Sequence, residues 1–270
     1  MQYTKKVNLH IHTLYSDGIH SVRAVLKSAK KQGLDIIAIT DHNEIRGAKK
    51  AWKLAEKYGP VVLPGAELFF RVDHKLCELL VYFPDPSSLE RFYLEFRFHS
   101  FVPRFDSLDD LVKKVKAYGG AVAAPHPYGH KGLLINKEKI NFSAIEVLNC
   151  FHDTRNNNAA KVYAKARHCI ELASADMHVF KSALTRAHTI LFSNYEISIE
   201  QILKNLNGEL KTIRFLPKGT NMPSWQRWLQ GLSCSFTVVK FLIRQDFTYL
   251  HLHNMHALKH RLKKLASLED

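Results

Sequence analysis

Short apolar segments alternate with helical segments along most of the chain, and this alternation limits the folds it can adopt. In residues 7–12 every second side chain is apolar, which is typical of a strand. We predict further strands at 35–40, 61–67, 76–83, 121–125, 144–148, 170–175 and 188–192, and helices at 21–31, 44–58, 108–118 and 157–167. Gly33 and Gly59 follow the first two helices, where a helix commonly ends. The pattern predicts an α/β fold with a largely parallel sheet closed into a barrel.

Composition excludes several classes of protein. Hydrophobic residues make up 46% of the 270 residues and charged residues 24%, which is enough apolar material for a core. We find no apolar run of the roughly 18 residues that a membrane span needs, and the N-terminus does not resemble a signal peptide. The four cysteines (Cys77, Cys150, Cys169, Cys234) form no C-x-x-C pair, which favours a reducing, cytoplasmic location.

The pattern changes near residue 195, so we predict a domain over 1–194 and a helical extension over 195–270. Residues 201–270 hold 11 of the 39 Lys and Arg residues but only 4 of the 25 Asp and Glu residues. A helix is expected at 197–206, a loop at 216–223 and helical structure from Trp225 onward. The aromatic and basic side chains there favour either packing on the barrel or contact with nucleic acid. The histidines at 253, 256 and 260 share a helix face, which we interpret as a polar face rather than a second metal site.

Histidines and carboxylates gather where the predicted strands end. The segments are His10-x-His12 with Asp17-Gly18, Thr40-Asp41-His42-Asn43, Gly65-x-Glu67, His126-Pro127 and Asp176-x-His178. Side chains two apart on a strand face the same way, and the carboxyl-end rim of a parallel barrel is where functional groups meet. Imidazole and carboxylate are preferred ligands of Zn, Mn and Fe, so the sequence predicts a site for two or three divalent metal ions.

Over residues 7–193 this set of motifs resembles the PHP (polymerase and histidinol phosphatase) superfamily of metal-dependent phosphoesterases. The resemblance implies a distorted seven-stranded β/α barrel with a trinuclear metal centre. By this resemblance one ion would bind His10, His12, Glu67 and Asp176, and a second would bind Asp17, His42 and His178. A third would bind Glu67, His126 and Glu78. His10, His12, Glu67, Asp176 and His178 would then be the catalytic residues, acting through the bound metals.

The chain departs from its relatives at two points. In many relatives a histidine lies eleven residues after the glutamate, where this chain has Glu78. Glu67 and His126 are only 59 residues apart, which leaves no room for the lid that some family members carry there. We therefore expect an open mouth, suited to bulky or polymeric substrates.

Several residues near the predicted rim have more than one interpretation. Asp41 is interpreted as supporting a ligand or capping a helix. Glu146 and Asn149 end the sixth strand and either contact substrate or form a buried pairing. Phosphate also attracts cations, and the candidates are Arg155 first, then Lys131, Lys181 and Arg186.

These observations predict a metal-dependent hydrolase of phosphate esters, of the phosphatase or exonuclease type. The expected substrate is a nucleotide, an oligonucleotide or a small phosphomonoester, with an ion-activated water as the nucleophile. The alternative is a nucleic-acid-binding protein with a vestigial barrel, in which the basic extension over 195–270 makes the contacts. The intact set of ligand residues favours the enzyme.

Overall fold

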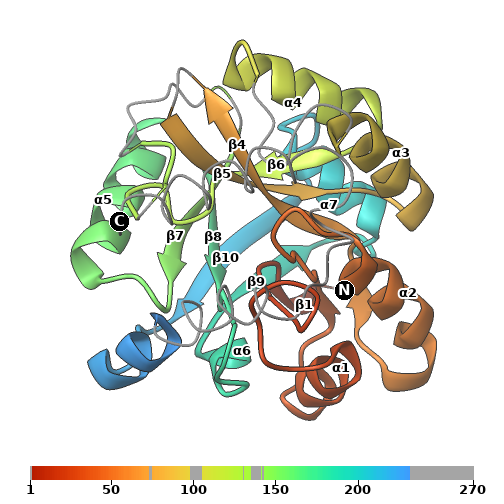
Figure 1. Ribbon diagram of the computed structural model, residues 1–270, viewed down its shortest axis with the longest axis vertical. Coiled ribbons are helices and arrows are strands. Elements are labelled where there is room, and N and C mark those ends of the chain that lie inside the picture. The colour runs from red at the N-terminus through yellow and green to blue at the C-terminus, as the bar shows by residue number, and fades with distance from the viewer. Residues whose placement is uncertain are drawn as a thin grey trace, which may run out of the picture.

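A computed structural model of the chain describes residues 2–72, 75–97, 105–129, 131–134, 141 and 143–231. It is an α/β protein: the strands lie in the middle, and α1 to α5 lie around the outside (Figure 1). The N-terminal part of the chain enters this arrangement through β1 (Tyr3–Asn8), which lies between a parallel and an antiparallel neighbour.

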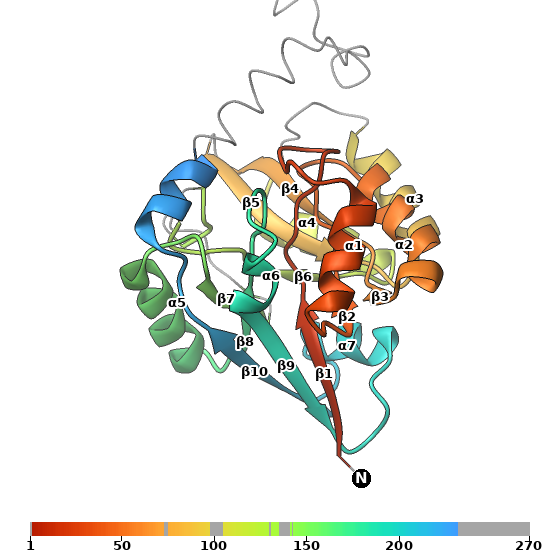
Figure 2. The same ribbon diagram turned by 90° about the horizontal axis from the view of Figure 1, so that it is seen from below.

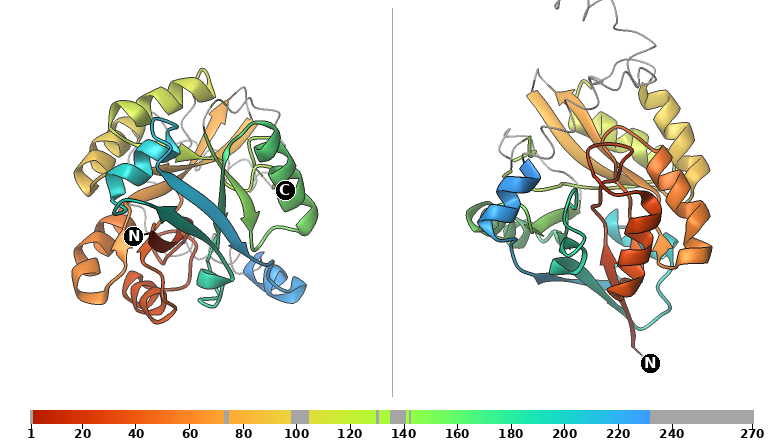
Figure 3. Two further views of the ribbon diagram at one scale, coloured as in Figure 1. Left: turned by 180° about the vertical axis from the view of Figure 1, so that it is seen from behind. Right: turned by 60° about the horizontal axis from the view of Figure 1, so that its bottom comes forward.

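The largest sheet has the strand order β10-β9-β1-β2-β3. The parallel ladder joins β1 to β2 (Ile36–Ile37) and β2 to β3 (Val61–Val62). On the other side of β1 lie β9 (Ala187–Ser193) and then β10 (Ile213–Gly219), both paired antiparallel, as Figures 2 and 3 show.

Two smaller sheets complete the set of strands. One has the order β4-β5-β6 and is antiparallel throughout, with β4 at Gly65–Val72, β5 at Lys75–Tyr82 and β6 at Ala121–Ala123. The other pairs β7 (Ala144–Asn149) with β8 (Ile170–Ser174) in parallel. Single parallel bridges connect the sheets at Ile11–Met177, His42–Glu67 and Ala124–Ile145.

The prediction of a largely parallel sheet is therefore wrong, because the ladders are mixed. The two-residue connection between β4 and β5 can join only antiparallel neighbours. The strand expected at 61–67 is divided between two sheets at Pro64, which has no backbone N–H to donate to a ladder. Among the ranges described above, the ladders do not close into one barrel.

The helices begin and end largely where their capping residues predict. Ser21 caps α1 (Val22–Lys31) through its side chain, and Gly59 ends α2 (Arg46–Tyr58) in a left-handed conformation with φ of 86°. The other predicted helices are found as α4 (Leu108–Ala117), α5 (Thr154–Ala166) and α7 (Ile199–Leu206), and a short α6 (Ala183–Arg186) precedes β9.

One helix was not predicted. The sequence analysis gives no helix between the strand at 76–83 and the helix at 108–118, whereas α3 (Pro86–Arg97) lies there. The Asp85 carboxylate accepts hydrogen bonds from the backbone N–H groups of Ser87 and Ser88, at 2.8 and 2.9 Å. An N-terminal carboxylate followed by proline in the first turn is a common helix start, so this signal was present in the sequence.

Alternate residues of the strands pack into two cores. Val7, Leu9 and Ile36 belong to an inner core, which Ile202 and Leu206 of α7 close at one end. The neighbouring strand residues pack outward against the helices, in a second cluster with buried residues of α1, α2 and α4. The inner core ends where the polar residues after β1, such as His10 and His12, begin.

Part of the extension joins the main sheet. The loop expected at 216–223 is wrong over its first part, because β10 pairs with β9 along its whole length. Pro217 is tolerated there since β10 is an edge strand of its sheet. A further helix covers residues 224–231. The division at residue 194 stays a prediction, and the predicted helical structure beyond 231, including Cys234 and the histidines at 251, 253, 256 and 260, lies outside the described residues.

Within the described ranges, no helix is both long enough and apolar enough to cross a membrane.

Candidate metal centre

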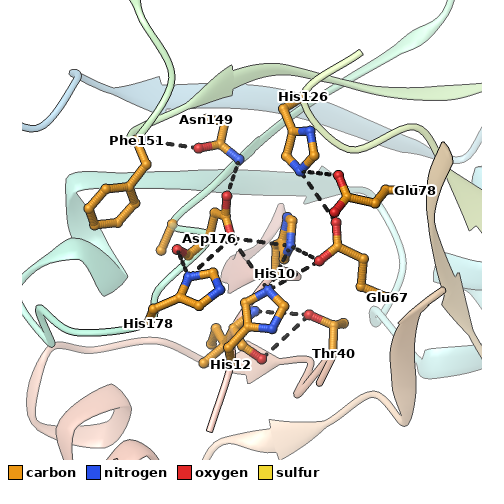
Figure 4. Close-up of polar contacts among 12 residues, drawn as sticks. His10, His12, Thr40, Glu67, Glu78, His126, Asn149, Phe151, Asp176 and His178 are labelled. Atoms are coloured by element: carbon orange, nitrogen blue, oxygen red, sulfur yellow. Dashed lines mark hydrogen bonds and ion pairs between the residues drawn. The ribbon is translucent and has the colours of Figure 1, made fainter. Parts of the chain in front are cut away.

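The structure brings all nine predicted ligand residues to one end of the strands, although they come from six separate parts of the chain. Figure 4 shows seven of them, without Asp17 and His42. Most are buried, and only Asp17 and His42 are partly exposed. The nine are His10 and His12 after β1, Asp17 in the following loop, His42 after β2, Glu67 in β4, Glu78 in β5, His126 after β6, and Asp176 and His178 after β8.

Four donor atoms form the tightest part of this cluster. The Nε2 atoms of His10 and His12 are 3.1 Å apart. Glu67 Oε2 lies 3.1 Å from the first and 3.2 Å from the second. Asp176 Oδ1 is 3.4 Å from both (Figure 4). Two imidazole nitrogens and two carboxylate oxygens thus face one common point.

The chemistry and the spacing of these four atoms fit a metal ion. The donor atoms of His10, His12 and Glu67 lie 3.1–3.2 Å apart, and ligand atoms about 2 Å from one tetrahedral Zn²⁺ ion lie about 3.3 Å from one another. Asp176 Oδ1 is 3.4 Å from both imidazole nitrogens and adds a second carboxylate. The His10 Nδ1 atom is 2.9 Å from Glu146 Oε1. Since Glu146 accepts the Nδ1 proton, Nε2 of His10 presents its lone pair to the common point.

Of the two interpretations given for Glu146, contact with substrate or a buried pairing, the contact with His10 favours the buried pairing. Its other oxygen, Oε2, accepts hydrogen bonds from the His126 backbone N–H at 2.9 Å and from Asn149 Nδ2 at 3.2 Å. Asn149 Nδ2 also donates to Asp176 Oδ2 at 3.1 Å. Glu146 and Asn149 of β7 thus orient predicted ligands on three neighbouring segments.

A second group of donor atoms surrounds Asp17. The donor atoms of His12, Asp17, His42 and His178 all lie within 4.8 Å of one another. Asp17 is 3.1 Å from His178 Nε2 and 3.5 Å from His42 Nε2. Burial raises the pKa of Asp17, but His178 and His42 more than offset this and hold it well below its usual value. Asp17 is thus an anion held against imidazole nitrogens, as a metal ligand must be.

Asp41 supports this second group from behind. It is buried, and its carboxylate accepts hydrogen bonds from Thr13 N and Thr13 Oγ1, both at 2.7 Å, and from Ser16 Oγ at 2.8 Å. These bonds fix the loop that carries Asp17. Gly18 lets the same loop pass close to the backbone of His12, because a Cβ at this position would lie 2.6 Å from the His12 carbonyl carbon.

A third group of donor atoms includes the second oxygen of Glu67 and lies on the other side of the cluster. Glu67 Oε1 is 3.3 Å from His126 Nε2, which is 3.7 Å from Glu78 Oε2. Glu78 also faces a cation, since Lys131 Nζ lies 3.4 Å from its Oε1. Burial and the neighbouring Glu67 raise the pKa of Glu78. This group therefore places two carboxylates close to one imidazole and has an ammonium beside it.

The predicted phosphate-binding residues lie at unequal distances from the cluster. Lys131 contacts it through Glu78 and also lies over the Phe69 ring, 4.3 Å from its centroid. Arg155 is exposed in the first turn of α5, and Lys181 is exposed beside α1, where its carbonyl accepts a bond from Gln32. Arg186 donates to the Asn221 carbonyl at 3.0 Å. The structure thus brings only Lys131 into contact with the predicted ligands.

Two residues that the sequence analysis did not single out contact the ligands. The His152 ring stacks on His126 with 4.5 Å between centroids, and burial together with His126 lowers its pKa to about 4. Gln230, in the helix at 224–231, contacts both Asp176 and His178. Neither residue has a motif or a periodic position that marks it in the sequence.

The fold and this cluster define an α/β protein with a His- and carboxylate-rich centre suited to divalent metal ions. The family model of the PHP domain matches residues 8–233. The chain belongs to the PHP domain family.

Relatives in sequence cover different shares of the chain. An uncharacterized protein of Methanocaldococcus jannaschii is 31% identical over 160 residues, which is 54% of this chain and 83% of the relative. A 5'-3' exoribonuclease of Haemophilus influenzae is 35% identical over 65 residues, 24% of this chain and 24% of the relative. The latter match therefore concerns only a small part of either protein.

Solved structures share the fold at low sequence identity. A two-domain protein of Bacteroides vulgatus containing a predicted PHP-like metal-dependent phosphoesterase superposes with a TM-score of 0.60 at 18% identity. The match covers 81% of this chain and 66% of that one, just under two thirds of its length. The lesion-specific endonuclease EndoQ of Pyrococcus furiosus gives 0.58 at 16% identity, over 80% of this chain and 59% of that one.

Proposed function

We propose that this protein is a metal-dependent hydrolase of phosphate esters that holds two or three divalent ions, Zn, Mn or Fe, in the cluster around Glu67. The observation that carries the proposal is the convergence of His10 Nε2, His12 Nε2, Glu67 Oε2 and Asp176 Oδ1 on one point. When bound, such ions supply Lewis acidity that activates water and offsets the charge of a phosphoryl group. In this proposal the three sheets, connected by the single parallel bridges, together form the distorted barrel typical of the family.

The side chains of this chain supply the remaining requirements. Three carboxylates offset the charge of the ions: the buried Glu67 and Asp176 and the partly exposed Asp17. Glu146 keeps the His10 imidazole in the tautomer that faces the ions. Lys131 stands beside the third group and is 28% exposed, so its ammonium can turn from Glu78 to a phosphoryl oxygen of an arriving substrate. No serine or cysteine nucleophile is required.

The test is hydrolysis of a chromogenic phosphate ester, nucleotides and oligonucleotides by the full chain after complete metal removal and after reconstitution with Zn²⁺, Mn²⁺ or Fe²⁺. We expect turnover only in the reconstituted protein, with at least two ions per chain by elemental analysis. Unchanged turnover after complete metal removal, or failure to bind any metal, contradicts the proposal and leaves the vestigial-barrel alternative.

A basic surface favours nucleic acid over a small phosphomonoester as the substrate. It consists of the outer sides of α1 and α2, which lie side by side in Figures 1 and 2. Seven exposed cations on it have no carboxylate within ion-pair distance in the described part of the chain: Arg23, Lys27, Lys30, Lys31, Lys50, Lys53 and Lys57. We refer to these seven residues, with Tyr15 and Tyr58, as the α1–α2 face.

The α1–α2 face also places cations around aromatic rings. Arg23, Lys27 and Lys57 lie 5.4–5.7 Å from the centroid of the Tyr58 ring. Lys50 lies 5.7 Å from that of Tyr15, which is in the same loop as the predicted ligand Asp17. Interleaved cations and aromatic rings are typical of surfaces that bind single-stranded nucleic acid, and this one begins beside the metal centre.

Replacing Arg23, Lys27 and Lys57 together by glutamine is expected to weaken binding of a single-stranded oligonucleotide. If each cation neutralises one phosphate, the slope of log affinity against log salt concentration should fall by about 2. Metal content and hydrolysis of a small chromogenic ester should not change. The matched control is glutamine at Lys161, Lys165 and Arg167, which are exposed on and just after α5, on the other side of the molecule (Figure 1). Equal losses in both triple variants would contradict a specific role of the α1–α2 face.

The third group yields a separate prediction. Replacing Glu78 by histidine is expected to preserve or tighten binding of the third ion, because it supplies the imidazole ligand that many relatives have at this position and removes a carboxylate next to Glu67. Metal stoichiometry by elemental analysis, before and after dialysis against a weak chelator, measures this effect. The Lys131→Met variant serves as the comparison, since it removes the ammonium but keeps Glu78. Loss of one ion in the histidine variant alone would show that Glu78 ligates in a way histidine cannot reproduce.

A further inference from the structure

Gln230 is a polar residue that is nearly completely buried although its neighbours along the helix are not. Its exposed fraction is 4%, while Trp228 and Leu229 are 65% and 39% exposed. Glutamine is mostly a surface residue, and its amide requires hydrogen-bond partners when it is buried. Among the described residues, the hydrogen-bond partners of the Gln230 side chain lie in the short segment that carries two predicted metal ligands.

Both ends of the Gln230 amide contact this segment. Nε2 donates to the Asp176 carbonyl oxygen at 2.9 Å and lies 3.2 Å from His178 Nδ1. Oε1 accepts from the backbone N–H groups of His178 and Val179, both at 3.4 Å. The single side chain thus spans the turn from its first carbonyl to its last two N–H groups.

That turn needs support from outside. Asp176 has a φ of 46°, the left-handed region that a residue with a side chain rarely occupies and that is unfavourable without compensation. The His178 Nδ1 atom lies 3.0 Å from the Asp176 carbonyl and donates to it, so His178 Nε2 faces Asp17 at 3.1 Å. The conformation of the turn therefore sets the direction of Asp176 toward the first group and of His178 toward the second.

The helix at 224–231 is itself anchored to the rim of the centre. The Trp225 ring contacts Phe180 edge-on, with 6.1 Å between centroids. Just before the helix, Met222 N donates to the Cys150 carbonyl at 2.7 Å, and Asn221 Nδ2 donates to the His152 carbonyl at 2.7 Å. Gln230 is thus presented to the turn from a segment held on both the β7 and the β8 sides.

We infer that Gln230 is a positioning residue of the metal centre, which fixes the 176–179 turn so that Asp176 and His178 meet their ions. The inference rests on the proposed function and assigns part of the centre to a helix that follows all the recognised motifs. Residues that hold metal ligands in place typically change metal affinity by about 10- to 100-fold when they are replaced. The effect should be largest for the ion bound by His178.

The experiment compares Gln230→Ala and Gln230→Met with Gln226→Ala in the full chain. Methionine keeps the volume of the side chain but has no amide, and Gln226 is the same residue type one turn earlier on the same helix. The probe is Co²⁺, titrated into metal-free protein and followed by its visible absorption spectrum and by equilibrium dialysis. We expect both Gln230 variants to bind the more weakly held of the Co²⁺ ions about 10- to 100-fold less tightly than the wild type does. The Co²⁺ spectrum at saturation should also be altered. Gln226→Ala should match the wild type.

The outcomes separate this inference from the proposed function. If the wild type binds no Co²⁺, the proposed function fails. If the wild type binds Co²⁺ and the folded Gln230→Met variant shows the same affinity and spectrum, only the positioning role is overturned. A merely structural role predicts a lower melting temperature with an unchanged spectrum at saturating Co²⁺, and this result also overturns it.

Discussion

Replacing Glu67 by glutamine is expected to abolish hydrolysis and to remove at least one ion per chain. Its carboxylate lies 3.1–3.3 Å from ring nitrogens of four imidazoles, those of His10, His12, His42 and His126. It is therefore shared by the first and third groups and contacts His12 and His42 of the second. The amide has nearly the same size but no negative charge, and one of its two ends is no longer an acceptor. We expect turnover to fall by about 10³-fold or more, because the first and third ions both lose an anionic ligand.

Elemental analysis and turnover of the chromogenic ester, measured on the same preparation, check this result. Glu56→Gln is the matched control, since Glu56 is an exposed carboxylate on α2. Asp176→Asn and His10→Ala should behave like Glu67→Gln, because both residues reach the same central point. Full metal content together with wild-type turnover in the Glu67 variant would contradict the proposed centre.

The sequence predicted which side chains the fold brings together because most of them stand at a strand end that local patterns reveal. His10 and His12 follow an alternating strand, and Asp176 and His178 follow a short apolar one, so the fold delivers them to the same rim. What joins those strands was harder to predict. β4 and β5 form a hairpin, and β9 runs antiparallel to β1, although apolar segments of this kind are also typical of parallel strands.

Residues that support the ligands could not be predicted in the same way. Glu146 remained ambiguous because a carboxylate at a strand end either contacts substrate or pairs in the interior, and only the 2.9 Å contact with His10 distinguishes the two. Gln230 follows the ligand closest to it in sequence, His178, by 52 residues, so no local period connects them. Arg155 was placed at the rim by its position after a strand, but it lies on the outward side of the α5 helix start.

Metal binding is expected to release protons and to weaken steeply as the pH falls. Burial lowers the pKa of His12 in the metal-free protein, but hydrogen bonds with Asp176 and Glu67 more than offset this and raise it to about 10. Burial also lowers the pKa of His126, but Glu67 and Glu78 more than offset this and raise it to about 9. Both imidazoles are therefore protonated at neutral pH without metal, whereas a ligand must be deprotonated.

The sign of the pH dependence follows from these two groups. Below pH 9 each ion that takes one of these imidazoles displaces its proton, so its affinity should fall about tenfold for each pH unit of acidification and for each proton displaced. Above about pH 10 this dependence should disappear, because both groups are already deprotonated. Calorimetric titration with Zn²⁺ at pH 6, 7 and 8, in pairs of buffers with different ionisation enthalpies, counts the protons directly. The carboxylates that raise these pKa values are themselves predicted ligands, so Glu67→Gln should reduce the number of protons released. A Zn²⁺ affinity that stays constant from pH 6 to 8 would contradict the arrangement of charges at the centre.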